Sequence, residues 1–332
     1  MASADTILVL GHRGLLGRAV VEACGRDCLV IEGGRRAFDL GSCGDEVPAA
    51  SPAESVSPGQ ARGILDELRR ELPGLGPQAA QMQAGCLLAR RTIAEIHPSI
   101  VINCAGYTDV DRAESEPELA LAVNGAGAGA VAQACAEVGA HLVHISTDYV
   151  FDGRARRPYG ENASPRPLSA YGRSKLEGER QVRAALAGAL IVRSAWLFGP
   201  GRPGFVDKVL ARARRGQEVR VVTDQVGSPT YTRDLARALV ELARRRVSGL
   251  VHLVNQGQAS RFELARQCLR LAGLDPELVR PVTTAEMGPV PAPRPAYSVL
   301  EGRRAARLLG APLPTWLDAL RRYLAETESG PS

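Results

Sequence analysis

The sequence predicts an α/β protein built on a doubly wound parallel sheet. Continuous apolar runs of strand length recur along the chain and alternate with longer segments of helical periodicity. The first of these runs, residues 6–10, passes directly into a glycine-rich turn that opens a helix. Strands buried on both faces read as unbroken apolar runs, so helices should cover both sides of the sheet.

Composition is that of a globular protein with one large or two medium domains. The chain has 332 residues, of which 45% are apolar and 23% charged. Its net charge is +5, and arginine-rich segments such as 212–215 and 244–246 lie at the ends of helical patterns, where they complement the helix dipole. We therefore expect no nucleic-acid partner, although a modest positive field would attract an anionic nucleotide ligand.

The seven cysteines include no Cys-x-x-Cys pair. Buried thiols in a reducing cytoplasm explain them better than a disulfide frame or a zinc site, so we expect no metal site. The sequence shows neither a signal peptide nor an apolar run long enough to cross a bilayer. A cytoplasmic protein without a membrane partner is expected.

The glycine-rich turn has the features of a dinucleotide-binding site. Gly11, Gly14 and Gly17 recur at three-residue intervals, and Leu15 and Leu16 begin the helix that follows. Glycines permit a tight turn and let the backbone approach a pyrophosphate, which then rests on the helix N-terminus. A strand before the turn and a helix after it make a Rossmann-like domain the prediction.

The end of the second predicted strand, residues 28–31, should recognise the adenosine ribose. There Glu32 favours a free 2′-hydroxyl, whereas Arg35 and Arg36 favour a 2′-phosphate. Arg13 in the glycine-rich turn would reach the same phosphate, and several cations outweigh one anion. We expect a preference for NADPH with NADH still usable, the alternative being that the arginines form a solvated turn.

Residues from about 41 to 85 differ in composition from the rest of the chain. Pro, Ala, Ser, Gly and Gln dominate this segment, and it contains no aromatic residue. It predicts a partly disordered surface insertion without a catalytic role, the alternative being a partner-binding flap.

The next predicted strand ends in three small residues, Cys104, Ala105 and Gly106. Small side chains at the carboxyl edge of the sheet leave room for the ribose and phosphate on the nicotinamide side. Within the helix predicted at 117–138, Asn124 is a polar residue on an apolar stretch. It would bond backbone and help to position active-site water, or form a plain buried hydrogen bond.

The candidate catalytic groups follow the strand predicted at 142–145. Tyr171 and Lys175 are four residues apart, so on a helix they share one face. A phenol ionises near about pH 10, and a nearby ammonium would lower that pKa and make Tyr171 a general acid. Thr147, at the end of the strand, would hydrogen-bond the same substrate oxygen. The pair alone is a weak signal, and the dinucleotide turn strengthens it.

The second half of the chain consists of shorter alternating units. A strand at 189–193 leads to Trp196, whose flat face would pack a sugar or a base, unless the ring is simply core. The units after it are too few to close a second dinucleotide fold. We therefore divide the chain into an NAD(P)-binding Rossmann domain, 1–185, and a mainly substrate-binding part, 186–332, which contributes some strands to the Rossmann sheet.

Together these motifs resemble the dTDP-4-dehydrorhamnose reductase family of extended short-chain dehydrogenase/reductases. The resemblance lies in the Tyr-x-x-x-Lys pair and in the stretches 101–114, 146–153, 224–230 and 294–300. It covers nearly the whole chain except about 41–85. It implies reduction of dTDP-4-dehydro-L-rhamnose by NAD(P)H at C4 of the sugar, giving dTDP-L-rhamnose.

The resemblance also implies roles for individual residues. Tyr171 would be the proton donor, Thr147 would tune the proton transfer, and Thr147, Asp148 and Trp196 would contact the dTDP-sugar. In two places the chain departs from the family pattern: Cys104 and Gly106 replace alanines, and Gly204 stands where a polar residue usually precedes Phe205. The implied cofactor contacts are Gly14, Leu15, Leu16, Asp39, Leu40, Cys104, Ala105, Gly106, Tyr171 and Lys175.

Two alternatives fit the same motifs. One is a non-catalytic, NADP-binding regulatory subunit of the methionine adenosyltransferase type, and the other is a reductase of a different nucleotide-linked 4-keto sugar. The 107–114 loop and an intact Thr147 follow the reductase pattern. The motifs specify neither a Mg²⁺ requirement nor an oligomeric state, and a homodimer stays open.

Overall fold

The computed structural model describes residues 5–25, 28–30, 87 and 89–328. The predictions for Arg35, Arg36, Asp39 and Leu40, and for the insertion at 41–85, lie outside the described residues.

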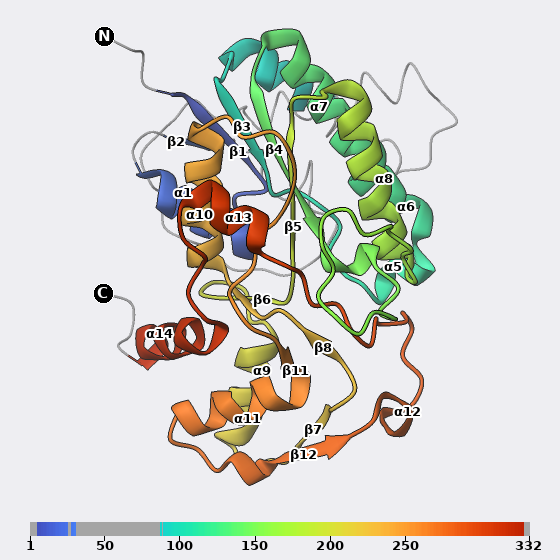
Figure 1. Ribbon diagram of the computed structural model, residues 1–332, viewed down its shortest axis with the longest axis vertical. Coiled ribbons are helices and arrows are strands. Elements are labelled where there is room, and N and C mark those ends of the chain that lie inside the picture. The colour runs from blue at the N-terminus through green and yellow to red at the C-terminus, as the bar shows by residue number, and fades with distance from the viewer. Residues whose placement is uncertain (1–4, 26–27, 31–86, 88, 329–332) are drawn as a thin grey trace, which may run out of the picture.

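A six-stranded sheet in the order β10-β5-β4-β3-β1-β2 forms the centre of the molecule (Figure 1). Every neighbouring pair in this sheet is parallel. The predicted doubly wound parallel sheet is therefore confirmed. Its strands are β1 (Ile7–Leu10), β2 (Cys28–Val30), β3 (Ile100–Asn103), β4 (His141–Thr147), β5 (Leu190–Ser194) and β10 (Gly249–His252).

Helices cover both faces of the sheet, and β1 shows how. Ile7 and Val9 belong to a core shared with α1 (Leu15–Cys24) and α10 (Thr232–Arg244). Leu8 and Leu10 belong to the core on the other face, which α7 (Gly127–Val138), α8 (Ala170–Ala185) and the helical residues 89–96 complete. Burial on both faces is the physical reason for the unbroken apolar runs.

A smaller body lies beyond the carboxyl ends of these strands (Figure 1). Its own core contains the clustered rings of Phe198, Tyr231 and Tyr323. It is built from three two-stranded ladders and the helices between them. These elements are β6 (Leu197–Phe198), α9 (Phe205–Ala213), β7 (Val219–Val222), β8 (Val226–Gly227), β9 (Thr230–Tyr231), β11 (Ala259–Ser260), α11 (Arg261–Leu271), η4 (Pro276–Leu278), β12 (Val279–Val282), α12 (Thr284–Met287) and α14 (Trp316–Glu328).

The helix predicted at 117–138 is interrupted. It consists of α6 (Pro117–Leu121), a π-helical turn (Ala122–Ala126) and α7, with the short α5 (Arg112–Ser115) before it. In length and composition the stretch Pro117–Val138 could cross a membrane, so the expectation of no such run is wrong. However, 61% of its most apolar window is buried, and α6 and α7 pack against α8, which is typical of a core helix.

The remaining elements are α13 (Arg303–Leu309), which packs on α10, and η3 (Asp148–Val150), a single 3₁₀ turn directly after β4.

Candidate active site

The glycine-rich turn joins β1 to α1 and lies against the end of β3. Gly11 has φ = 75°, a left-handed conformation that favours glycine. A Cβ at Gly11 would come within 2.6 Å of the backbone nitrogen of Ala105, and one at Gly17 within 2.2 Å of the Gly11 carbonyl oxygen. The turn therefore closes only with glycine at both positions, and it places the N-terminus of α1 beside Ala105.

Small residues continue this surface after β3. A Cβ at Gly106 would lie 3.0 Å from Asn124 Oδ1 and 3.9 Å from Lys175 Nζ. Burial raises the pKa of the Cys104 thiol to about 12, so this side chain remains neutral. The structure thus brings the turn, the 104–106 segment and Lys175 to one edge of the sheet, as the sequence predicted.

Asn124 lies in the π-helical turn and forms three hydrogen bonds. Its Oδ1 accepts from the Tyr107 backbone N–H at 2.9 Å, and its Nδ2 donates to the Tyr107 carbonyl at 3.0 Å and to Ser174 Oγ at 2.9 Å. The predicted bond to backbone is confirmed. Asn124 ties the loop after β3 to α8, and π-helical turns often occur at functional sites.

Tyr171 and Lys175 lie in the first two turns of α8. The Ser169 side chain caps this helix by accepting from the Gly172 backbone N–H at 3.1 Å. Lys175 is 6% exposed, and its Nζ donates to the Ile145 carbonyl at 2.6 Å. Burial lowers the pKa of Lys175 to about 8, while Glu179, one turn further along α8, acts in the opposite direction.

The pKa of Tyr171 differs from the prediction. Burial raises it, and Lys175 is not among the groups that act on it, so the expected lowering by the ammonium is wrong. The physical reason is that desolvation of the phenol dominates while Lys175 bonds the Ile145 carbonyl. The opposing influence is a hydrogen bond with the Thr147 side chain, which lowers the pKa of Tyr171.

Asp148 follows Thr147 and is 2% exposed. Its Oδ2 accepts from Ser298 Oγ at 2.6 Å, and its Oδ1 accepts from Thr147 Oγ1 at 3.1 Å. Burial raises the pKa of Asp148 to about 6. Both carboxyl oxygens have partners, so Asp148 holds Thr147 in place and connects it to the C-terminal part of the chain.

Trp196 lies just past β5 with φ = 47°, which is strained for a tryptophan. A Cβ at Gly227 would come within 2.4 Å of the indole, so the ring packs directly on that glycine. The guanidinium of Arg261 lies 3.6 Å from the ring centroid. The ring is only partly buried, and a neighbouring side chain rather than solvent covers one of its faces.

The comparisons with known proteins agree with this geometry. A family model described as the RmlD substrate binding domain matches residues 64–329. The dTDP-4-dehydrorhamnose reductase of Mycolicibacterium smegmatis is 46% identical over 239 residues, which cover 71% of this chain and 72% of that protein. The chain belongs to the dTDP-4-dehydrorhamnose reductase family.

Two further relatives extend the comparison. A solved dTDP-4-dehydrorhamnose reductase of Bacillus anthracis in complex with NADP is 31% identical, with a TM-score of 0.78 over 98% of this chain and 100% of that one. A dTDP-4-keto-6-deoxy-D-glucose reductase of Streptomyces niveus is 42% identical over 236 residues, 70% of this chain and 81% of the relative. The resemblance stated from the motifs is confirmed at the level of the family.

Three side chains at this site had no role in the sequence prediction. They are Tyr149, whose ring meets that of Tyr171 edge-on at 5.7 Å, and the arginines Arg261 and Arg294. Both guanidinium groups hydrogen-bond Tyr149. Arg294 occurs in a stretch that resembles the family, which was the available signal, whereas no sequence spacing marks Arg261.

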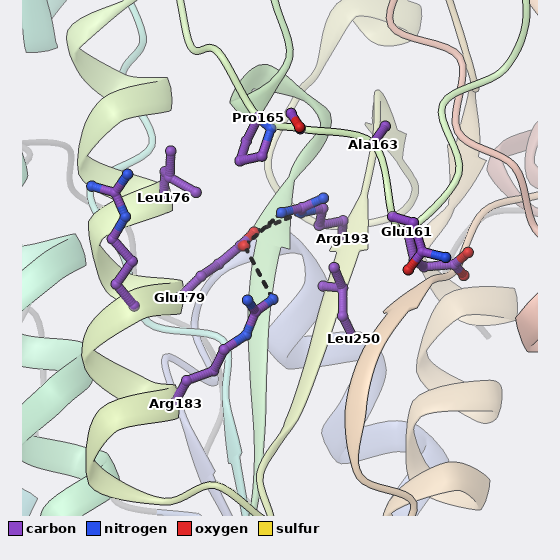
Figure 2. A pocket seen from close by; sticks show the side chains of 11 residues that line it. Glu161, Ala163, Pro165, Leu176, Glu179, Arg183, Arg193 and Leu250 are labelled. Atoms are coloured by element: carbon purple, nitrogen blue, oxygen red, sulfur yellow. Dashed lines mark hydrogen bonds and ion pairs between the residues drawn. The ribbon is translucent and has the colours of Figure 1, made fainter.

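A separate pocket of about 290 Å³ lies behind α8 (Figure 2). Figure 2 shows Glu179 of α8 and Arg193 of β5 pointing toward each other across it. Neither Tyr171 nor Thr147 contributes to its lining, so it is not the catalytic site. Its lining residues are Glu161, Asn162, Ala163, Ser164, Pro165, Leu176, Glu179, Arg180, Arg183, Arg193 and Leu250.

Proposed function

We propose that this protein reduces the C4 ketone of a dTDP-linked sugar with a nicotinamide cofactor, and that its substrate is dTDP-4-dehydro-L-rhamnose. The observation that carries this proposal is the arrangement of three side chains. The Thr147 hydroxyl hydrogen-bonds Tyr171, and Lys175 lies one turn further along α8, beside the small residues after β3. Two hydroxyls that meet at one point suit a carbonyl oxygen that becomes an alcohol.

The residues present fit a dinucleotide. The turn at Gly11, Gly14 and Gly17 keeps side chains away from the N-terminus of α1, where a pyrophosphate is favoured. The 104–106 segment and Lys175 would hold the nicotinamide half, and Leu15, Leu16, Asp39 and Leu40 would complete the adenosine side. When bound, the reduced nicotinamide supplies a hydride.

Each catalytic side chain then has a definite task. Tyr171 donates its proton to the sugar O4, and its raised pKa keeps the phenol protonated at neutral pH. The Thr147 hydroxyl stabilises the tyrosinate that this transfer leaves, since the hydrogen bond between them lowers the pKa of Tyr171. Lys175 fixes its ammonium on the Ile145 carbonyl and presents positive charge to the cofactor ribose.

A second candidate substrate comes from the comparisons. One relative is named a dTDP-4-keto-6-deoxy-D-glucose reductase, so reduction of another dTDP-linked 4-keto sugar is the alternative. A non-catalytic regulatory subunit is disfavoured because it would need neither a hydrogen-bonded Thr147–Tyr171 pair nor a buried Lys175.

The test is NADPH consumption with dTDP-4-dehydro-L-rhamnose and, in parallel, with dTDP-4-keto-6-deoxy-D-glucose. We expect turnover with the first, with the product identified as dTDP-L-rhamnose by NMR. Faster turnover of the second sugar would assign the alternative substrate. Absence of turnover with either sugar, in protein that binds NADPH, would overturn the proposed activity.

We expect NADPH binding to weaken as the pH rises through about 8, the pKa of Lys175. The ammonium is present below this pH and is lost above it. Tyr171 stays protonated over the same range because burial raises its pKa. The measurement is the Kd of NADPH from neutral to moderately alkaline pH, with Lys175→Met as the control that should bind weakly and show no such dependence. A wild-type Kd that is constant across this range would exclude Lys175 as the titrating group.

We also propose that Arg35 and Arg36 select NADPH over NADH. Guanidinium groups bind phosphate through charge-assisted hydrogen bonds, and both arginines follow the second strand by a few residues. The double variant Arg35→Ala/Arg36→Ala should therefore lose its preference, measured as the ratio of kcat/KM for the two cofactors. A wild type that prefers NADH, or a double variant that still prefers NADPH, would leave these arginines without a role in selectivity.

The division of labour along the chain is part of the proposal. Residues 1–185 would bind the cofactor and residues 186–332 mainly the substrate. Two separate hydrophobic cores support it, one around the parallel sheet and one in the smaller body. The later half also supplies β5 and β10 to the main sheet, so the two parts share a frame.

A further inference from the structure

Two arginines of the smaller body converge on one tyrosine of the catalytic domain. Arg261 begins α11 and Arg294 lies in the proline-rich loop after α12, and each guanidinium hydrogen-bonds Tyr149. Their mutual repulsion contributes to a lowered pKa of Arg261. Two like charges on one phenol are unfavourable unless a negative charge lies close to both.

Only one of these arginines has a carboxylate partner among the residues that the structure describes. Asp111 accepts from Arg294 Nη1 at 2.6 Å and from Arg294 Nη2 at 2.7 Å. Within the same described ranges no carboxylate oxygen lies within 4.0 Å of the Arg261 guanidinium. Desolvation is the main cause that lowers the pKa of Arg261, so its cation is taken out of water without an ion pair.

Aromatic rings hold Arg261 in place instead. Its guanidinium lies 3.6 Å from the centroid of Trp196 and 5.1 Å from that of Phe205. Arg261 remains partly accessible, so an anion can reach the N–H groups that the stacking leaves at the edge of the plane. The arrangement presents a fixed, uncompensated cation rather than a surface arginine with free rotation.

The arginine pair lies next to the reacting centre. Tyr149, which both arginines bond, meets Tyr171 edge-on at 5.7 Å between ring centroids. Asp148, which bonds Thr147, also lies close enough to raise the pKa of Arg261. A sugar whose O4 meets Tyr171 would therefore direct the substituent on its far side toward positive charge.

We propose that Arg261 and Arg294 bind the diphosphate of the sugar nucleotide and so restrict this enzyme to nucleoside-diphosphate-linked sugars. The inference rests on the proposed function, because it takes the substrate to be a dTDP-sugar. Guanidinium groups recognise phosphate oxygens through paired, charge-assisted hydrogen bonds. A diphosphate between them would also offset the repulsion within the pair. Trp196 would then serve as the platform that orients Arg261, which is a different role from direct contact with the base.

The test compares binding of deoxythymidine diphosphate and deoxythymidine by calorimetry to the full-length protein with bound NADP. The variant is Arg261→Met, which keeps an aliphatic chain over Trp196 and removes the charge. Its matched control is Arg266→Met, because Arg266 lies on the same helix with its guanidinium 5.6 Å from the Phe262 ring centroid, and it pairs with Glu277 instead. Arg261→Lys keeps the charge without the paired N–H geometry.

In Arg261→Met we expect the Kd of deoxythymidine diphosphate to rise about 10- to 100-fold, as for loss of a charged hydrogen-bonding partner. The Kd values of deoxythymidine and NADPH should not change, Arg261→Lys should fall between, and Arg266→Met should match the wild type. Unchanged diphosphate affinity in Arg261→Met, or an equal loss for deoxythymidine, would overturn the inference and leave Arg261 as packing for Trp196. Failure of the wild type to bind deoxythymidine diphosphate at all would instead overturn the proposed substrate class.

Discussion

Replacing Tyr171 with phenylalanine should lower kcat by about two to four decades, the usual contribution of a general acid. The substitution removes the proton that the C4 oxygen must receive and keeps the ring that packs edge-on against Tyr149. The affinity for NADPH should stay close to that of the wild type, because Lys175 and the glycine turn are intact. Steady-state NADPH oxidation gives kcat, and fluorescence titration gives the cofactor Kd.

Tyr159→Phe is the matched control for this experiment. Tyr159 is 8% exposed, its hydroxyl donates to Asp152 at 2.9 Å, and its ring stacks on Phe151 rather than facing Tyr171. Its removal tests the general cost of losing a buried phenol hydroxyl, and turnover should be retained. Comparable turnover by Tyr171→Phe would mean that another group, such as Thr147 or water, donates the proton.

Replacing Arg193 with methionine should destabilise the protein by about 3–5 kcal/mol, the range for breaking one side of a buried ion pair. Arg193 and Glu179 are 2% and 1% exposed. Arg193 Nε donates to Glu179 Oε1 and Nη2 to Oε2, each at 2.7 Å, and Ser146 Oγ donates to the same carboxylate at 2.6 Å. Without Arg193 the carboxylate would remain buried with its charge largely uncompensated. Urea unfolding measures the loss.

The double variant Glu179→Leu/Arg193→Met makes this prediction sharper. Removing both charges eliminates the buried, unpaired carboxylate, so the double variant should be more stable than Arg193→Met alone. Arg90→Met is the control, since the Arg90–Glu137 pair at 2.8 Å is exposed and such pairs contribute little. A double variant that is less stable than the single one would show that Glu179 stabilises the fold through Ser146 and Lys175 rather than through Arg193.

Short-range features of this protein follow from the sequence alone. The conformation of Gly11 and the closeness of Gly17 to its carbonyl depend on residues six positions apart, and glycine is required at both. The four-residue spacing of Tyr171 and Lys175 sets their common face as soon as α8 forms. Apolar runs predict buried parallel strands because both faces of such a sheet exclude water.

What only the tertiary structure decided involves distant residues and burial. The sequence predicted that Lys175 would lower the pKa of Tyr171, but desolvation of the folded site outweighs that effect and raises it. Tyr149 meets Arg294, 145 positions away along the chain, and Glu179 meets Arg193 only because α8 packs on β5. Spacing along the chain determines contacts within one element, whereas desolvation and the pairing of charges depend on which elements the whole fold brings together.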